Sequence, residues 1–365
     1  MIRNYLPKDL QELVRWYERY VSPVSLVAGF LADNYILLRR VDLWTSNALL
    51  FFYLTVAAGG ILLINAVEAG RVRDSRIINA APLIPVVVQF SFGGLFSGYL
   101  SLYSRSAGLF QSWVFILVLA ALLLSNERFT RLYRQFSFQI PLYFTVLFSF
   151  FTFFLPVVVH QIGPIIFLAS GCFSIGAVAL LLWTLSLIAP QREAQDRTTV
   201  ARSIAVIFLV FNALYFSNLI PPLPLSLKEA GVYHDISRSS GVYKLIGETT
   251  PWYEAFIYRE TFHRVPRDIV YVYTAIFAPS GLTTPIIHEW QRYDDVSRKW
   301  VTTNTISFSI NGGRDGGYRG YTQKSGLAEG KWRVNVLTTY GATIGRVSFN
   351  VEDATSTPAL VITEE

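Results

Sequence analysis

The stretch from 163 to 202, GPIIFLASGCFSIGAVALLLWTLSLIAPQREAQDRTTVAR, decides the fold of the first part of this chain. Residues 163–189 include no charged side chain, and three arginines follow at Arg192, Arg197 and Arg202. A helix needs about 20 mainly apolar residues to cross the core of a bilayer. The stretch therefore predicts a membrane-spanning helix that ends at a basic loop.

The same pattern of apolar runs and basic connections extends over residues 21–224. Six further apolar runs cover 22–38, 46–67, 77–102, 108–125, 139–160 and 203–220. Alternate connections, counted with the N-terminal arm, hold 13 arginines and lysines, and the others hold 3. Because cytoplasmic loops retain basic residues, we expect seven transmembrane helices and a cytoplasmic N-terminus. Residues 225–365 are then expected outside the cytoplasm.

The first run is the weakest of the seven, because Asp33 and Asn34 interrupt it. If it did not cross the membrane, the difference in basic content between the two sets of connections would vanish. We therefore keep it as a span. Asp33 is also an acidic residue inside a span, and membrane-embedded carboxylates are functional candidates by default. An ion pair with nearby Arg39 or Arg40, or a position that faces water, explains Asp33 equally well.

Composition excludes several classes of protein. The chain has 365 residues, of which 52% are hydrophobic and 15% charged, as in polytopic membrane proteins. The net charge of +6 comes from residues 1–224, whereas residues 225–365 are balanced. The basic excess therefore indicates membrane orientation and contact with lipid headgroups, not nucleic-acid binding. The single cysteine, Cys172, lies in a predicted span, so the region after 225 needs a core without disulfides.

Residues 1–20 are predicted to include an amphipathic helix that lies at the cytoplasmic face of the membrane. Leu6, Leu10, Leu13 and Tyr17 recur at helical spacing and form one apolar stripe. An interfacial anchor is the preferred interpretation. A helix that binds a partner protein is the alternative.

The spans themselves favour packing over a ligand path. Phenylalanines crowd the run 139–160, and small residues such as Gly171 and Gly176 lie in the run 163–189. Small residues let neighbouring helices approach closely in a membrane.

After the last span the period of the apolar residues changes to two. Residues 225–267 are expected to form a mixed polar linker with a short helix from Thr250 to about His263. Strands are expected at 269–278, 285–293, 300–310, 318–324, 331–339 and 343–351. With a turn near Tyr340 and Gly341, they indicate an immunoglobulin-like antiparallel sandwich over 268–352. Residues 353–365 are expected to be a flexible tail.

A glycine-rich segment at 312–320, GGRDGGYRG, is the densest polar motif. It lacks the lysine and the following helix of a phosphate-binding loop, and a long hairpin loop is the simpler interpretation. As a binding site, Arg314 and Arg319 would hold a carboxylate or phosphate. Tyr318 and Tyr321 would then stack on a sugar or peptide.

The histidines give a second, weaker set of candidates. His288 and Trp290 share one face of a predicted strand, where a buried, hydrogen-bonded histidine is a simpler interpretation than a ligand contact. His160 lies at the outer end of a predicted span. No spacing of cysteines and histidines matches a metal site, and we expect no metal and no cofactor.

The residues around His288, Trp290, Ile306, Phe308 and the glycine segment, with Gly330-Lys-Trp332-Arg333-Val334 and Gly345-Arg346, resemble a bacterial domain family of unknown function, number twenty-nine fourteen. The resemblance covers residues 285–351. It implies a Gram-negative inner-membrane protein with a periplasmic C-terminal domain. It implies no activity.

Three functions stay open at this point. The leading one is a non-enzymatic membrane anchor that presents a periplasmic recognition domain to an envelope protein or glycan. A channel or transporter would need a polar path, for which the candidates are Asp33, Asn34, Asn65, Gln89, Gln111 and Asn212. An enzyme acting on a lipid-linked substrate would have Asp33 or His160 as its candidates, and a lateral groove beside them would favour it.

Overall fold

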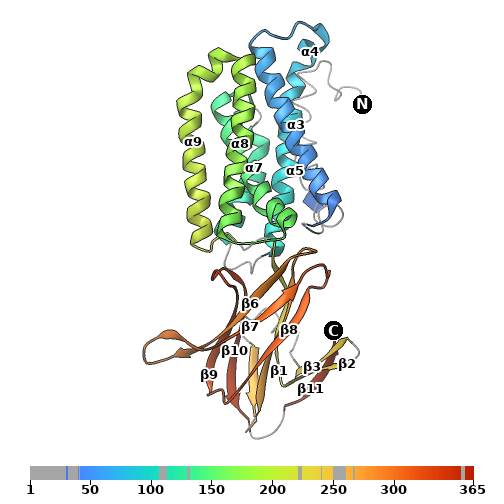
Figure 1. Cartoon of the computed structure of the whole chain (residues 1–365), viewed down its shortest axis with the longest axis vertical. Helices are drawn as coiled ribbons and strands as arrows, with labels where there is room; N and C mark the ends of the chain where they lie inside the picture. The colour runs from blue at the N-terminus through green and yellow to red at the C-terminus, as the bar shows by residue number, and fades with distance from the viewer. Residues whose placement is uncertain are drawn as a thin grey trace, which may run out of the picture. The chain divides into compact units, whose positions relative to one another are not determined.

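The computed structural model describes residues 30–31, 40, 42–106, 113–129, 132–220, 224–239, 241–249, 260–265, 268–354 and 358–365. They divide into a helical unit that ends at Ile220 and a β-rich unit that begins at Pro221 (Figure 1). The predicted amphipathic helix at 1–20 and nearly all of the first predicted span, with Asp33 and Asn34, lie outside the described residues.

The helical unit contains several long apolar helices and some short helical segments. In chain order they are α3 (Trp44–Glu68), α4 (Ser75–Ala80), η4 (Ala81–Leu83), α5 (Ile84–Ser106), α6 (Trp113–Ser125), η5 (Asn126–Phe129), η6 (Leu132–Arg134), α7 (Phe136–Val159), α8 (Pro164–Ile188) and α9 (Pro190–Phe216). Within the described residues, five helical segments are long and apolar enough to cross a membrane, and α6 is shorter. Several long apolar helices therefore suggest a membrane protein, as the sequence predicted.

Helix α9 corrects one predicted boundary. The basic stretch with Arg192, Arg197 and Arg202 was expected to be a loop, but it forms the first turns of α9. Pro190 suits a first helical position, and Glu193 lies in the first turn, where a negative charge is favourable. Arginine, glutamine, glutamate and alanine are also good helix formers. The charged residues thus precede the apolar run 203–220, but they do not precede the start of its helix, which begins at Pro190.

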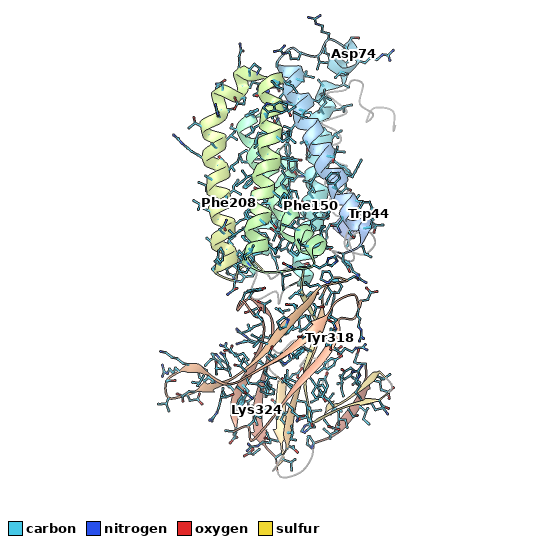
Figure 2. The ribbon with its side chains drawn as sticks, viewed as in Figure 1. Trp44, Asp74, Phe150, Phe208, Tyr318 and Lys324 are labelled. Carbon is cyan, nitrogen blue, oxygen red and sulfur yellow. The ribbon has the colours of Figure 1, made fainter. Side chains whose placement is uncertain are left out.

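The interior of the helical unit is built around α7, which packs against α3, α8 and α9. Phe148 of α7 stacks on Phe211 and Phe208 of α9, with ring centroids 4.6 and 5.8 Å apart. A Cβ added at Gly171 of α8 would lie 2.6 Å from the Phe208 ring, so this glycine permits the close approach that the sequence predicted. Gly176 has open space around it. Figure 2 labels Phe208 on α9 and Phe150 on α7.

The β-rich unit has eleven strands in its described residues. They are β1 (Ser226–Tyr233), β2 (Asp235–Ser239), β3 (Val242–Glu248), β4 (Glu260–Arg264), β5 (Ile269–Phe277), β6 (Thr283–Asp294), β7 (Lys299–Asn311), β8 (Tyr318–Ser325), β9 (Gly330–Thr338), β10 (Thr343–Asp353) and β11 (Leu360–Glu364). Sheet A has the order β1-β5-β8, sheet B the order β11-β3-β2, and sheet C the order β4-β10-β9-β6-β7. All pairs are antiparallel except β10 with β4.

Sheet A has a packed core on each of its two faces. Val270 and Val272 of β5 join the core that sheet A shares with sheet C, where Trp290, Trp332 and Phe349 are buried. Tyr273 and Ala275, on the opposite face of β5, join the core shared with Ile236, Tyr243 and Leu245 of sheet B. Burial on both faces explains why β5 is a nearly continuous apolar run.

Two predictions about the edges of this unit are wrong. The linker expected at 225–248 forms β1, β2 and β3, and the tail expected at 353–365 contains β11, which pairs with β3. Most residues of β2 and all residues of β11 are exposed, and the charged ones among them gave these stretches a polar composition. Residues 250–259 of the predicted short helix lie outside the described residues, and its last part, 260–263, belongs to strand β4.

The six predicted strands correspond to β5–β10, and β9 and β10 form the predicted hairpin around Gly341. The glycine segment, however, does not join a hairpin. It connects β7 at the edge of sheet C to β8 at the edge of sheet A.

Candidate functional site

The glycine segment packs tightly against the turn that precedes β6. The amide groups of Gly312 and Gly313 donate to the carbonyls of Leu282 and Ala278 over 2.9 and 3.0 Å. A Cβ at Gly312 would lie 1.8 Å from the Pro279 carbonyl oxygen. These glycines are therefore required by a close backbone approach, which supports the structural interpretation of the segment.

The four predicted residues near this segment fall into two pairs. The guanidinium group of Arg314 lies 5.9 Å from the centre of the Tyr318 ring. Arg319 instead donates to the Glu365 carboxylate over 3.3 Å, on the side of sheet B. Tyr321 shares that side, 6.5 Å from the Tyr243 ring. Strand alternation separates Tyr318 from Arg319, so the four side chains do not form a single cluster. Figure 2 labels Tyr318 at the start of β8.

His288 and Trp290 lie in the interior of the β-rich unit, and both are fully buried. The ring nitrogens of His288 lie 3.1 Å from the Thr274 hydroxyl and 2.9 Å from the Thr322 hydroxyl. Trp290 Nε1 donates to the same Thr322 hydroxyl over 3.2 Å. Burial lowers the pKa of His288 to about 4. At neutral pH His288 is an uncharged part of the core.

Two of the described polar candidates of the helical unit, Asn65 and Asn212, bond to another side chain or to the backbone. Asn65 Nδ2 donates to Gln139 Oε1 over 2.8 Å, and both residues are fully buried. Asn212 donates to the Phe208 carbonyl one turn earlier. His160 is exposed at the left-handed residue that ends α7. Gln111 lies outside the described residues. Mutual bonding of Asn65 and Gln139 indicates a structural role for them.

A cluster that the sequence did not indicate lies at one end of sheets A, B and C. Glu248 Oε1 accepts from the His263 backbone amide over 2.7 Å and lies 3.0 Å from His234 Nε2. Glu248 Oε2 lies 2.6 Å from His263 Nδ1. His234 Nδ1 is 3.5 Å from Asp268 Oδ2. One carboxylate thus holds two histidines, and His234 has a carboxylate at each ring nitrogen.

This histidine–carboxylate cluster (His234, Glu248, His263 and Asp268) borders a pocket of about 400 Å³. The pocket is formed by residues of β1, β4 and β11 and by the end of β3, and its wall includes Glu248, Glu260 and Tyr233. Its size lies within the range usual for small-ligand sites. The two carboxylates supply hydrogen-bond acceptors, and the open edges of strands supply both backbone donors and backbone acceptors.

The two carboxyl groups of the pocket differ in proton affinity. Burial raises the pKa of Glu248, but hydrogen bonds from His234 and His263 outweigh it, so the net pKa lies below the usual range. Burial and the nearby Glu248 charge raise the pKa of Glu260, against a hydrogen bond from the Val232 amide. The two carboxyl groups of the pocket therefore bind a proton with different affinity, Glu260 more readily than Glu248.

Metal binding has no support in the part of the chain that the structure describes. No group of three or more histidine, cysteine, aspartate or glutamate side chains there is arranged to hold a metal ion. The cluster escaped prediction because its four residues come from separate strand ends and have no local spacing. The sequence offered only one indication of the cluster: each of its four residues lies at or near the end of a strand.

Comparison with known proteins gives one family. Residues 283–351, which include most of β6–β10, match the model of a family described as "Protein of unknown function (DUF2914)". The match confirms the family resemblance of the C-terminal region. It includes none of the four cluster residues, and the description carries no chemistry.

The other comparisons add no argument. No curated protein matches the sequence significantly. A solved structure of Pseudomonas fluorescens alkylpurine DNA glycosylase AlkC, bound to DNA containing an abasic site analog, is 11% identical to this chain. The alignment covers 83% of this chain and 99% of that one, with a TM-score of 0.21. At such a low score the likeness carries no inference about fold or function.

Proposed function

We propose that this chain is a bacterial inner-membrane protein with seven spans that presents a β-sheet recognition domain in the periplasm. The distribution of basic residues between the apolar runs supports the orientation. The apolar helices of the described residues support the anchor. The β-rich unit has its own core and its own pocket, which are the requirements for a recognition domain. We also propose that residues 268–352 of this unit form an immunoglobulin-like antiparallel sandwich.

The pocket beside the histidine–carboxylate cluster is the observation that carries this proposal. Its carboxylates and open strand edges accept hydrogen bonds, so it suits the hydroxyl and amino groups of a glycan or the backbone of an envelope protein. Tyr233 supplies an aromatic face, as is common where sugars or peptides bind. Nothing in this arrangement requires a nucleophile, and we assign no reaction to it.

Site-specific photocross-linking in intact cells tests the proposal. A cross-linking residue at Thr261, which lines the pocket, is expected to form an adduct with an envelope protein or glycan identified by mass spectrometry. The control position is Val296, which is 94% exposed in the β6–β7 turn. Glu260→Gln should weaken the adduct at Thr261. Equal labelling at Thr261 and Val296, unaffected by Glu260→Gln, would contradict the recognition role.

A reporter fused after Glu365 tests the orientation separately. An enzyme that is active only outside the cytoplasm should be active in this position. Activity of a reporter that works only in the cytoplasm would reverse the proposed topology.

The pair Arg314 and Tyr318 is a second surface for an anionic group, because Arg314 is exposed above an aromatic ring. Arg319 is engaged by Glu365, so Arg314→Ala is the sharper test and Arg319→Ala is its matched control. Loss of partner binding in Arg314→Ala with unchanged thermal stability would move the site from the pocket to this pair.

A further inference from the structure

The helical unit contains a lateral groove between α8 and α9, with a volume of about 690 Å³. Its apolar walls come from both helices: Ile175, Ala179 and Leu182 on α8, and Ala201, Ile204 and Ala205 on α9. The small side chains leave space between two helices that lie side by side and antiparallel (Figure 1). This volume is in the range of small-molecule sites.

One end of the groove is amphipathic. Helix α8 has no charged side chain up to its last residue, Ile188, and α9 returns beside it from Pro190. Glu193 and Arg197 in the first turns of α9 therefore face the same groove as Leu182 and Trp183 of α8. An occupant has to contact apolar groups along most of its length and charged groups at one end. An amphiphile such as a lipid meets this requirement.

The charged end identifies the kind of headgroup. Arg197 Nε lies 3.8 Å from Glu193 Oε1, and the Arg197 side chain is 79% exposed. The Glu193 side chain is only 17% exposed, but the exposed guanidinium group and the long separation make the pair weak, so a ligand can replace the contact. A guanidinium group binds phosphate through two parallel hydrogen bonds, and the carboxylate of Glu193 suits an ammonium group. The pair is complementary to a headgroup that carries both charges.

A second protein helix fits this end less well. It would have to cover Arg197 and Glu193 with groups that satisfy both charges at the depth where α8 is apolar. Helix α9 is also the least buried of the five candidate spans, with 11% of its apolar window inside the protein. Most of the α9 surface is therefore free to contact lipid.

We propose that the α8–α9 groove is a binding site for a zwitterionic phospholipid, with its phosphate on Arg197, its ammonium group on Glu193 and an acyl chain between Ala179 and Ala205. This site is separate from the pocket of the β-rich unit and does not depend on the recognition role.

Fluorescence quenching in the full-length protein tests this site. Trp183 lines the groove and is 62% exposed, so a phospholipid with brominated acyl chains should quench it on binding. The Trp183 signal is the difference between the wild-type protein and Trp183→Phe in detergent micelles. Brominated phosphatidylethanolamine and phosphatidylglycerol are compared as probes, because only the first carries an ammonium group.

We expect saturable quenching by phosphatidylethanolamine at lower lipid content than by phosphatidylglycerol. Arg197→Ala should raise the half-saturating content of both lipids by about tenfold, the size usual for a lost hydrogen bond to a charged group. Glu193→Gln should remove the preference for phosphatidylethanolamine. Arg202→Ala, an exposed arginine of α9 outside the groove lining, is the matched control and should change neither value.

A variant that fills the groove gives an independent result. Ala205→Phe should abolish the saturable component, and an unchanged helical circular dichroism spectrum would show that the helices remain folded. Quenching that is linear, equal for both lipids and unaffected by Arg197→Ala would show ordinary boundary lipid and overturn the site. If no quenching occurs and Ala201→Cys forms a cross-link between two copies of the chain, the groove is occupied by a helix of a second copy. This result would also overturn the proposed lipid site.

Discussion

The two packed layers of the β-rich unit differ in the chemistry of their interiors. The layer between sheets A and C is made of valines, Trp290, Trp332 and Phe349, with His288 held neutral between threonine hydroxyls. The layer between sheets A and B is rich in tyrosine and has the Arg319–Glu365 pair at its border. Strand β5 belongs to both. The comparison suggests that the first layer stabilises the fold, whereas the second carries charge and the neighbouring pocket.

The largest expected effect tests the apolar layer. Trp332 is 3% exposed, and its indole nitrogen donates to the Ala328 carbonyl over 2.8 Å. Trp332→Ala should lower the unfolding free energy of the β-rich unit by about 3–5 kcal/mol, because it leaves a cavity. Hydrogen exchange of the β9 and β10 peptides in the full-length protein measures this. Trp300→Ala, on an edge strand beside Arg333, is the control and should cost about 1 kcal/mol. An equal loss in both variants would show that the layer does not dominate stability.

A pH effect tests the neutral histidine in the same layer. The pKa of His288 is about 4 when folded and about 6.5 in an unfolded chain. Between these values the unfolded chain binds more protons, so the unfolding free energy falls as the pH drops through this window. The full loss is roughly 3 kcal/mol at 1.36 kcal/mol per pKa unit. Hydrogen exchange of the β5, β6 and β8 peptides at pH 7, 5.5 and 4.5 should show this decrease in the unfolding free energy. The variant His288→Gln should lack the decrease. A dependence that survives in His288→Gln belongs to another group.

The histidine–carboxylate cluster should respond in a different pH range. Glu248→Gln replaces one acceptor oxygen by an amide that cannot accept from His263, and we expect a loss of about 1–3 kcal/mol in the β3–β4 region. Because the folded pKa of Glu248 is lowered, its contribution is present above the usual carboxyl pKa and is lost as the pH falls through the lowered value. The wild type and the variant should therefore converge in acid. Exposed Glu329→Gln serves as the control, and a constant difference at all pH values would exclude ionisation of Glu248 as the cause.

The smallest effect concerns Tyr273, in the layer between sheets A and B. Its buried hydroxyl has no hydrogen-bond partner among the described residues. Tyr273→Phe should leave the unfolding free energy unchanged or raise it by up to about 1 kcal/mol. Tyr243 donates to the Arg319 carbonyl over 3.3 Å, so Tyr243→Phe should cost about 0.5–1.5 kcal/mol. Thermal melting of both variants gives the comparison. A marked loss in Tyr273→Phe would indicate that a group outside the described residues, or a bound molecule, uses this hydroxyl.

The layer between sheets A and C was predictable because its strands alternate strictly. In β9 and β10, Trp332, Val334, Val347 and Phe349 lie at even spacing between polar residues, and all four are buried. Sheet B was not predicted because its strands bury few residues. Strand β2 buries Ile236 alone, and β3 buries Tyr243 and Leu245, so neither shows a long alternation of apolar and polar residues. The parallel pairing of β4 with β10 joins strands that lie far apart in the sequence, so no local sequence pattern predicts it.

The candidate site was less predictable than the fold. The sequence correctly favoured a hydrogen-bonded core for His288, but the grouping of His234, Glu248, His263 and Asp268 depends on how three sheets end near one another. In the helical unit, the apolar runs located α3, α7 and α8 to within a few residues. They did not reveal that charged Arg197 faces the groove beside apolar Leu182, because this depends on the antiparallel register of two helices.

The pairing of β3 with β11 has a consequence for how fast this unit can form. Glu248 pairs with Leu360, and β4 pairs with β10, so one edge of β3 and strand β4 find their partners at the other end of the unit's sequence. Folding rates fall as contacts become more distant along the chain. Until β11 arrives, the outer edge of β3 offers unpaired backbone groups to any other strand. If β11 pairs slowly with β3, the β-rich unit needs protection from aggregation until folding is complete.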